Sequence, residues 1–202
     1  MKFIGITGGV GAGKTEILTF LEKQDGIKVM LADEIAHNLM LPGTKCHEKL
    51  EKLFEKDDVW KPDKIIDAKK MAAVIFADKE KRLALNAIVH PQVKEYVYEL
   101  CKKEQEKGEL RLLFLEAALL IEDGYDKICD ELWYIYTSKE NRRTRLKMSR
   151  GYSDEKIDRI FETQLSEEVY KEYCKVIIDN NHTIEETLNQ VKECINRREY
   201  NA

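Results

Sequence analysis

The chain has few cysteines, which can form disulfides, and few prolines, which break helices and strands. Its 202 residues include three prolines and five cysteines, and no two cysteines form a C-x-x-C pair. This scatter excludes a disulfide framework and a cysteine-based zinc site, and it indicates reduced thiols. The sequence also lacks internal repeats and the proline- or glycine-rich tracts that join independent domains. We therefore expect one compact domain.

Long apolar runs and an excess of basic charge are missing as well. No hydrophobic segment approaches the length of a membrane-spanning helix, so we expect no membrane partner. The first residues already form a strand-like segment instead of a cleavable leader, which favours a cytoplasmic protein. The net charge of −4 and the pI near 5.7 give no general attraction for nucleic acid, so we expect no nucleic-acid partner. Any site for a polyanion must be local.

What the chain does have is a glycine-rich loop near its start. Residues 8–15 read GGVGAGKT and follow the apolar segment KFIGIT. Gly8, Gly13, Lys14 and Thr15 fit the pattern G-x-x-x-x-G-K-[ST], in which backbone N–H groups surround a phosphate, the lysine reaches the β/γ-oxygens and the hydroxyl holds Mg²⁺. The apolar spacing after Lys14 predicts a helix, whose positive N-terminus adds to the attraction. The loop therefore predicts nucleotide binding.

The rest of the pattern predicts an α/β fold. After the apolar segment KFIGIT, further strand-like segments occur at 27–31, 110–115, 132–136 and 175–179. Helical patterns separate these segments. Short apolar strands that alternate with helices predict a five-stranded parallel sheet flanked by helices, with ligands at the carboxyl ends of the strands. About eighty residues separate the second strand from the third, and they read as amphipathic helices. This interval is too long for one crossover and predicts an inserted helical subdomain.

Two acidic residues stand where catalytic groups are expected. Glu116 ends the third strand-like segment, where it would serve magnesium as the aspartate of other phosphate-loop proteins does. Asp33 follows the second strand by two residues. A carboxylate at this edge can orient an attacking hydroxyl and accept its proton, but it can equally cap the helix that follows. The residues alone leave both alternatives open.

A run of cations follows the fourth strand. Five positive side chains lie within nine residues, and they are Arg142, Arg143, Arg145, Lys147 and Arg150. Such a run is commonly the solvated face of a helix. In an acidic protein, directly after a strand edge, the run favours a role facing phosphates.

An ordered series of motifs resembles the dephospho-CoA kinase family over almost the whole chain. The series runs from IGITGGVGAGKT through LADEIAHNLMLPG, LNAIVHP, EAALLIE, NRRTRLKMSR and FETQLS to VIIDNN. The resemblance implies a P-loop kinase fold and an enzyme that uses ATP and Mg²⁺ to phosphorylate the 3′-hydroxyl of dephospho-CoA. The partners implied are the small molecules dephospho-CoA and ATP, and we expect a monomer or a weak homo-oligomer. A nucleoside or nucleotide kinase, or a nucleotide-dependent switch protein, is the alternative.

The resemblance also implies a division of the single domain, residues 1–202. The core would comprise about 1–33, 108–137 and 170–202, the CoA-binding helical insertion about 34–107, and a lid over ATP about 138–169.

Residue by residue, the resemblance implies catalytic roles for Asp33 and Lys14. The family's lid arginine falls on Ser149, so that Arg145 and Arg150 are both candidates for the phosphates. Metal ligands would be Thr15 and Glu116, although Glu116 stands where the family has aspartate. The acceptor contacts implied besides Asp33 are Gln164 and His90, which precedes Pro91 at an expected helix boundary. The nucleotide-binding residues expected are Gly9, Val10, Gly11, Ala12, Gly13, Lys14, Thr15, Glu16 and Asn180.

Overall fold

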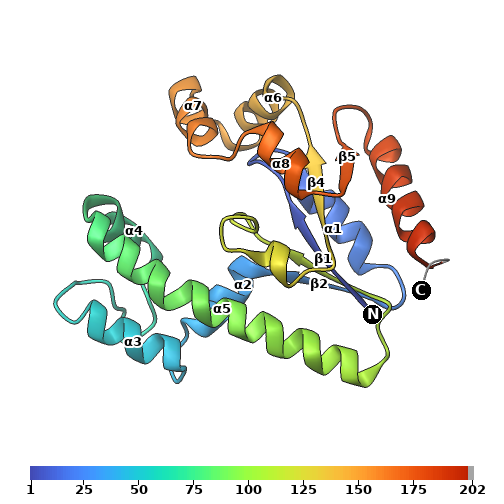
Figure 1. Cartoon of the computed structure of the whole chain (residues 1–202). Helices are drawn as coiled ribbons and strands as arrows, with labels where there is room; N and C mark the ends of the chain where they lie inside the picture. Colours follow the sequence, from blue (N-terminus) through green and yellow to red (C-terminus); the bar gives the residue numbers. More distant parts are fainter. Residues whose placement is uncertain (200–202) are drawn as a thin grey trace. The chain divides into compact units, whose positions relative to one another are not determined.

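The computed structural model describes residues 1–199, which form two compact units (Figure 1). Within the described residues, the first unit comprises residues 1–30 and 107–199, and the second comprises residues 31–106. The predicted roles of residues 34–107 in CoA binding and of 138–169 as a lid are not tested by this division and stay predictions.

A parallel sheet forms the centre of the first unit. Its strands lie in the order β2-β3-β1-β4-β5, which confirms the predicted five-stranded sheet. In the register of β1, Ile6 pairs with Glu116 on one side and Thr7 pairs with Tyr134 on the other. The ends of β1, β3 and β4 are therefore level at the carboxyl edge. The strands are β1 (Lys2–Thr7), β2 (Ile27–Leu31), β3 (Leu112–Glu116), β4 (Glu131–Tyr136) and β5 (Val176–Asp179).

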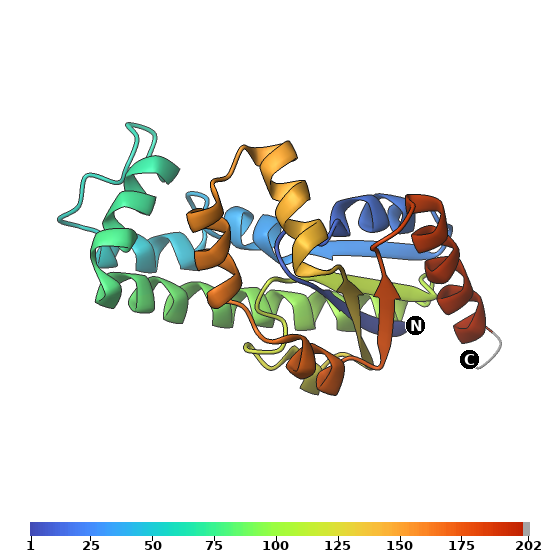
Figure 2. The ribbon, with the colours of Figure 1, turned by 90° about the horizontal axis from the view of Figure 1, so that it is seen from above.

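Helices cover the sheet because its strands are apolar on both faces. Ile4, Ile6 and Trp133 are among the fully buried side chains of the unit. Figure 2 shows α1 on one side of the sheet and α8 on the other, and α9 contacts both α1 and β5. The helical elements are α1 (Lys14–Glu22), the 3₁₀ turn η1 (Tyr125–Lys127), α6 (Lys139–Arg150), α7 (Asp154–Glu162), α8 (Glu167–Tyr173) and α9 (Ile184–Glu199).

The second unit is built of helices, as the sequence predicted for this interval. They are α2 (Ala32–Leu39), α3 (Lys45–Leu53), α4 (Ala68–Ala77) and α5 (Lys79–Lys107). The side chain of Thr44 accepts a hydrogen bond from the N–H of His47 and begins α3, while Asp67 accepts from two N–H groups and begins α4. Each capping oxygen satisfies helix donors that have no partner within the helix.

The expected helix boundary at His90 is wrong. α5 continues through Pro91, which lies inside the helix. Proline disfavours a helical conformation in the preceding residue, but tertiary packing of the long helix overrides this local preference. No helix of residues 1–199 is both long enough and apolar enough to cross a membrane.

Candidate active site

The phosphate loop connects β1 to α1 and leaves a helix N-terminus free. Gly13 stands at the N-cap of α1 with φ 82°, and no side chain accepts a hydrogen bond from the first turn. By contrast, Ser138 and Ser153 cap α6 and α7 with their hydroxyls. The first N–H groups of α1 are therefore available to an anion, and the helix dipole favours negative charge there. Gly11, with φ 84°, needs the same left-handed backbone region that glycine alone adopts readily.

Lys14 and Glu116 meet at the carboxyl edge of the sheet. Lys14 Nζ lies 3.3 Å from Glu116 Oε1 and donates a hydrogen bond to the carbonyl of Gly8 at 2.8 Å. The two side chains are about one-sixth exposed, at 16% and 17%. Because water still reaches this pair, its net stabilisation is modest, and a phosphate can compete for the ammonium group. The structure thus brings together the predicted catalytic lysine and one predicted metal ligand.

One loop carbonyl anchors the base of the loop. The oxygen of Ala12 accepts hydrogen bonds from Asn180 Nδ2 at 2.7 Å, Thr137 Oγ1 at 3.0 Å and Arg145 Nη1 at 3.2 Å. Asn180 is 4% exposed, and its side-chain oxygen accepts from Thr187. Three donors from the segments after β4 and β5 therefore hold the loop in place. Direct contact between Asn180 and the nucleotide stays a prediction.

The two candidate lid arginines lie in different surroundings. Arg145 also donates to the carbonyl of Asn180 at 2.7 Å, so its guanidinium lies against the base of the phosphate loop. Arg150, at the exposed end of α6, lies over the ring of Tyr152 at 5.9 Å. Within residues 1–199, Arg145 is the one of this pair that contacts the loop. This contact favours Arg145 for the phosphates, while the catalytic role of either arginine stays a prediction.

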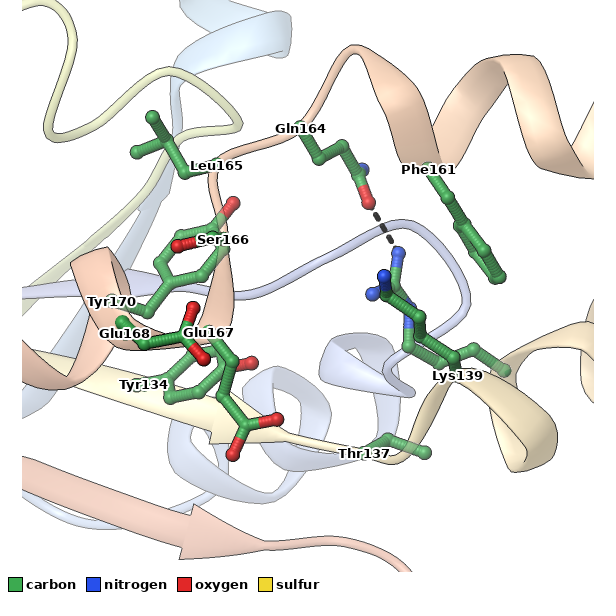
Figure 3. Close-up of a pocket in the computed structure, with 11 residues that line it drawn as sticks. Tyr134, Thr137, Lys139, Phe161, Gln164, Leu165, Ser166, Glu167, Glu168 and Tyr170 are labelled. Carbon is green, nitrogen blue, oxygen red and sulfur yellow. Dashed lines mark hydrogen bonds between the residues drawn. The ribbon is translucent and has the colours of Figure 1, made fainter.

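Gln164 lies beside a pocket of about 300 Å³ in the first unit. It follows α7 and accepts a hydrogen bond from Arg142, whose Nε donates to the carbonyl of Val10 at 2.9 Å. Figure 3 shows Gln164 and Phe161 on one side of this pocket and Tyr134 and Tyr170 on the other. The rings of Tyr134 and Tyr170 stack with centroids 4.6 Å apart. The predicted acceptor contact Gln164 is thus linked to the phosphate loop through one arginine.

Asp33 and His90 belong to the second unit. The N-cap of α2 is Leu31, and Asp33 lies exposed in the first turn. There its negative charge interacts favourably with the positive end of the helix dipole. The capping alternative for Asp33 is therefore wrong, because the N-cap lies two residues before Asp33. His90 is half-buried within α5.

The donor set suits magnesium only together with other oxygens. Mg²⁺ prefers oxygen ligands, which the hydroxyl of Thr15 and the carboxylate of Glu116 supply. Thr15 and Glu16 are exposed in the first turn of α1. Residues 1–199 contain no group of three or more histidine, cysteine or acidic side chains that would bind a metal alone. Magnesium would fit here together with a bound nucleotide, whose phosphate oxygens would supply the remaining ligands.

Sequence reasoning missed three residues of this edge. Thr137 was not singled out, although its place directly after β4 was a usable signal. Arg142 was seen within the cation run but received no role of its own. Thr7 is 1% exposed, and its hydroxyl has no hydrogen-bond partner among the described residues. No sequence pattern shows whether a buried threonine hydroxyl will have a hydrogen-bond partner.

The family model and the curated relatives point to one family. A model of the family described as "Dephospho-CoA kinase" matches residues 2–186. The dephospho-CoA kinase of Geobacter sulfurreducens is 33% identical over 193 residues, covering 96% of each chain. Among solved structures, TT1252 from Thermus thermophilus aligns with TM-score 0.78 and 27% identity over 97% of each chain. Dephospho-CoA kinase from Campylobacter jejuni aligns over 100% of both chains with TM-score 0.74 and 23% identity, which supports the fold.

Proposed function

The chain belongs to the dephospho-CoA kinase family, and from this premise we propose how its residues carry out the ATP-dependent phosphorylation of dephospho-CoA. The observation that carries the proposal is the phosphate loop, with Lys14 held beside Glu116 and an uncapped helix behind it. Loop N–H groups of residues 9–15 hold the β-phosphate, and the helix dipole favours its charge. Glu16 and Asn180 complete the nucleotide site in this proposal.

Phosphoryl transfer depends mainly on positioning and on neutralising oxygen charge. Lys14 leaves Glu116 for the β/γ-oxygens and follows the phosphoryl group as its bond to ADP breaks. Thr15 and Glu116 would hold Mg²⁺, which would supply neutralisation of the phosphate charge. Arg145, already at the base of the loop, adds a second positive group, and Arg150 remains the alternative.

Asp33 is the proposed base. Its carboxylate orients the 3′-hydroxyl of the acceptor ribose and takes the proton as the new P–O bond forms. His90 and Gln164 contact the acceptor, together with the helical insertion of residues 34–107. Water competes with the acceptor hydroxyl, so residues 138–169 must close over ATP when both substrates are bound. A cytoplasmic monomer or weak homo-oligomer completes the proposal.

Acceptor dependence of ADP release tests this function. We expect strong stimulation by dephospho-CoA and none by nucleosides or nucleoside monophosphates. Stimulation by a nucleoside would instead indicate a nucleoside kinase, and stimulation by no small acceptor would indicate a switch protein.

The Asp33→Asn variant tests the proposed base. It removes the charge and the proton acceptor while it keeps the size, so turnover should fall by roughly 10²- to 10⁴-fold with ATP affinity unchanged. Because Asp33 is not the N-cap, stability should change by no more than about 1 kcal/mol, the usual contribution of a first-turn acid. The measurements are kcat with dephospho-CoA and ATP binding by calorimetry. Glu34→Gln, in the same exposed turn, is the matched control. Near-normal turnover of Asp33→Asn would leave the chain without an identified base.

A further inference from the structure

Arg142 lies almost buried between the phosphate loop and the pocket of Figure 3. It is 8% exposed, and the centre of the Phe161 ring lies 4.4 Å from its guanidinium carbon. On its other side is Gly9, where an added Cβ would lie 2.3 Å from that carbon. Any side chain at position 9 would therefore displace the arginine. The loop glycine and the aromatic ring together fix the plane of the guanidinium.

The hydrogen bonds of Arg142 leave one end of its fork free. Nε donates to the carbonyl of Val10, and Nη2 donates to Gln164 Oε1. Nη1 has no hydrogen-bond partner within the described residues, and Arg142 lines the pocket. Two of the three nitrogens thus hold the group in place, while the third is available to a ligand.

The positive charge of Arg142 is not neutralised by the protein. Its neighbours on α6 are paired, since Arg143 contacts Asp154 and Asp158 and Lys147 contacts Asp154. Arg142 has no carboxylate partner among residues 1–199, and burial lowers the pKa of its guanidinium. Arginine nevertheless remains charged in proteins. A buried charge without a partner is costly, so the site is arranged for an anion that this chain does not provide.

The acidic residues of the pocket have partners of their own. Glu167 pairs with Lys171, and Glu168 hydrogen-bonds to Ser166. Figure 3 shows both carboxylates on the side of Tyr134, across the pocket from Gln164 and Phe161. An anion beside Arg142 would therefore lie away from them.

We propose that this pocket is an oxyanion site beside the phosphate loop, in which Nη1 of Arg142 donates to a phosphate oxygen of one of the two substrates. The inference rests on the proposed function for the identity of those substrates. Two phosphates have the required chemistry: the terminal phosphate of ATP and the diphosphate of dephospho-CoA. Arg142 is then a substrate-contacting residue, which its own bonds to Val10 and Gln164 preorganise.

Arginine-labelled enzyme tests the contact without any turnover. The Nε–Hε resonance of Arg142 is protected by its bond to Val10 and is identified by its loss in Arg142→Lys. ADP is added first, then in separate samples a non-hydrolysable ATP analogue or dephospho-CoA. A shift with the analogue beyond that with ADP indicates the terminal phosphate, and a shift with dephospho-CoA indicates the diphosphate. If neither the analogue nor dephospho-CoA shifts the resonance beyond its position with ADP, or if ADP alone gives the full shift, the separate oxyanion site is overturned.

Kinetics of Arg142→Gln provide the second test. Loss of a charged hydrogen bond should cost at least about tenfold, because such bonds are stronger than neutral ones. The loss falls on kcat if the terminal phosphate is the ligand, and on KM for dephospho-CoA if the diphosphate is. Arg142→Lys, which keeps the charge, should lose less, and Lys147→Gln should stay within about threefold of wild type. Equal losses in Arg142→Gln and Arg142→Lys would indicate a structural role and overturn the proposal.

The two proposals fail in different ways. If dephospho-CoA does not stimulate ADP release by the wild-type enzyme, the proposed function fails. The resonance of Arg142 would still report whether a phosphate binds in the pocket.

Discussion

At the scale of single residues, the phosphate loop depends on contacts that residues outside it make. Ala12 offers only a backbone oxygen, yet Thr137, Arg145 and Asn180 all donate to it. Gly13 makes this possible, since an added Cβ there would lie 2.5 Å from Asn180 Nδ2. The glycines are thus required both by the φ values of the loop and by the space its neighbours occupy.

Lys14→Ala tests the catalytic end of this loop. The change removes the positive charge from the β/γ-oxygens, and such transition-state contacts are typically worth ~3 kcal/mol or more, about a hundredfold in rate. The fold should survive, because the lost pair with Glu116 is partly exposed and weak. The measurement is kcat with dephospho-CoA, with thermal unfolding as the control. Turnover above about a tenth of wild type would show that Lys14 is not catalytic.

At the scale of elements, the helices differ in how their ends are satisfied. α3, α4, α6 and α7 begin at side chains that accept hydrogen bonds, whereas α1 begins at a glycine that accepts none. The helix proposed to bind the phosphates is therefore one that lacks a side-chain cap. The long helix α5 carries a different irregularity, an exposed proline in its interior.

Pro91→Ala should stabilise the protein. Proline costs roughly 3 kcal/mol more than alanine inside a helix, while it restricts the unfolded chain by ~0.4–1 kcal/mol. The helix term is larger, so we expect a net gain of about 2 to 2.6 kcal/mol in the free energy of unfolding. Urea unfolding measures it, with Glu95→Ala, exposed on the same helix, as the control. A less stable Pro91→Ala variant would show that packing around α5 depends on the proline ring.

At the scale of the whole molecule, buried thiol and phenol groups link stability to alkaline pH. Burial raises the pKa of the Cys174 thiol from 9.0 to about 12 and that of Tyr125 from 10.0 to about 12. Burial also raises the pKa of Tyr134. The folded protein therefore keeps protons that the unfolded chain releases. Stability from these groups is complete below about pH 9 and is lost as the pH rises towards 12.

Cys174→Ala tests this linkage. Each such group contributes a slope of about 1.4 kcal/mol per pH unit between its unfolded and folded pKa. Between about pH 9 and 10.5, Cys174 alone should therefore lower the free energy of unfolding by about 2 kcal/mol. We expect a shallower decline in the variant by urea unfolding at several pH values, whatever its stability at neutral pH. The same slope in both proteins would contradict the assignment.

The sheet, the phosphate loop and the helical nature of the second unit could all be predicted from the amino-acid sequence. Each of these depends on local chemistry, such as glycines that permit unusual φ values or apolar residues at strand and helix spacing. For the same reason Glu116 was correctly placed at a strand end. Where packing competed with a local preference, prediction failed, as at Pro91, where α5 continues. At Asp33 the sequence left capping and catalysis both open, and the structure removes capping because α2 begins at Ala32.

Which side chains contact one another could not be predicted, because those contacts form only when the chain is folded. Thr137, Asn180 and Ala12 are far apart in the chain and converge because parallel strands end at one edge. The sequence does not show which of the five clustered cationic side chains is buried and which are exposed to solvent. Neighbouring residues on a helix differ in the direction their side chains point, and that direction is set by packing. The structure pairs Arg143 and Lys147 with acids and leaves Arg142 unpaired against the loop. The sequence gives the number of positive side chains, but packing decides which of them have an acidic partner.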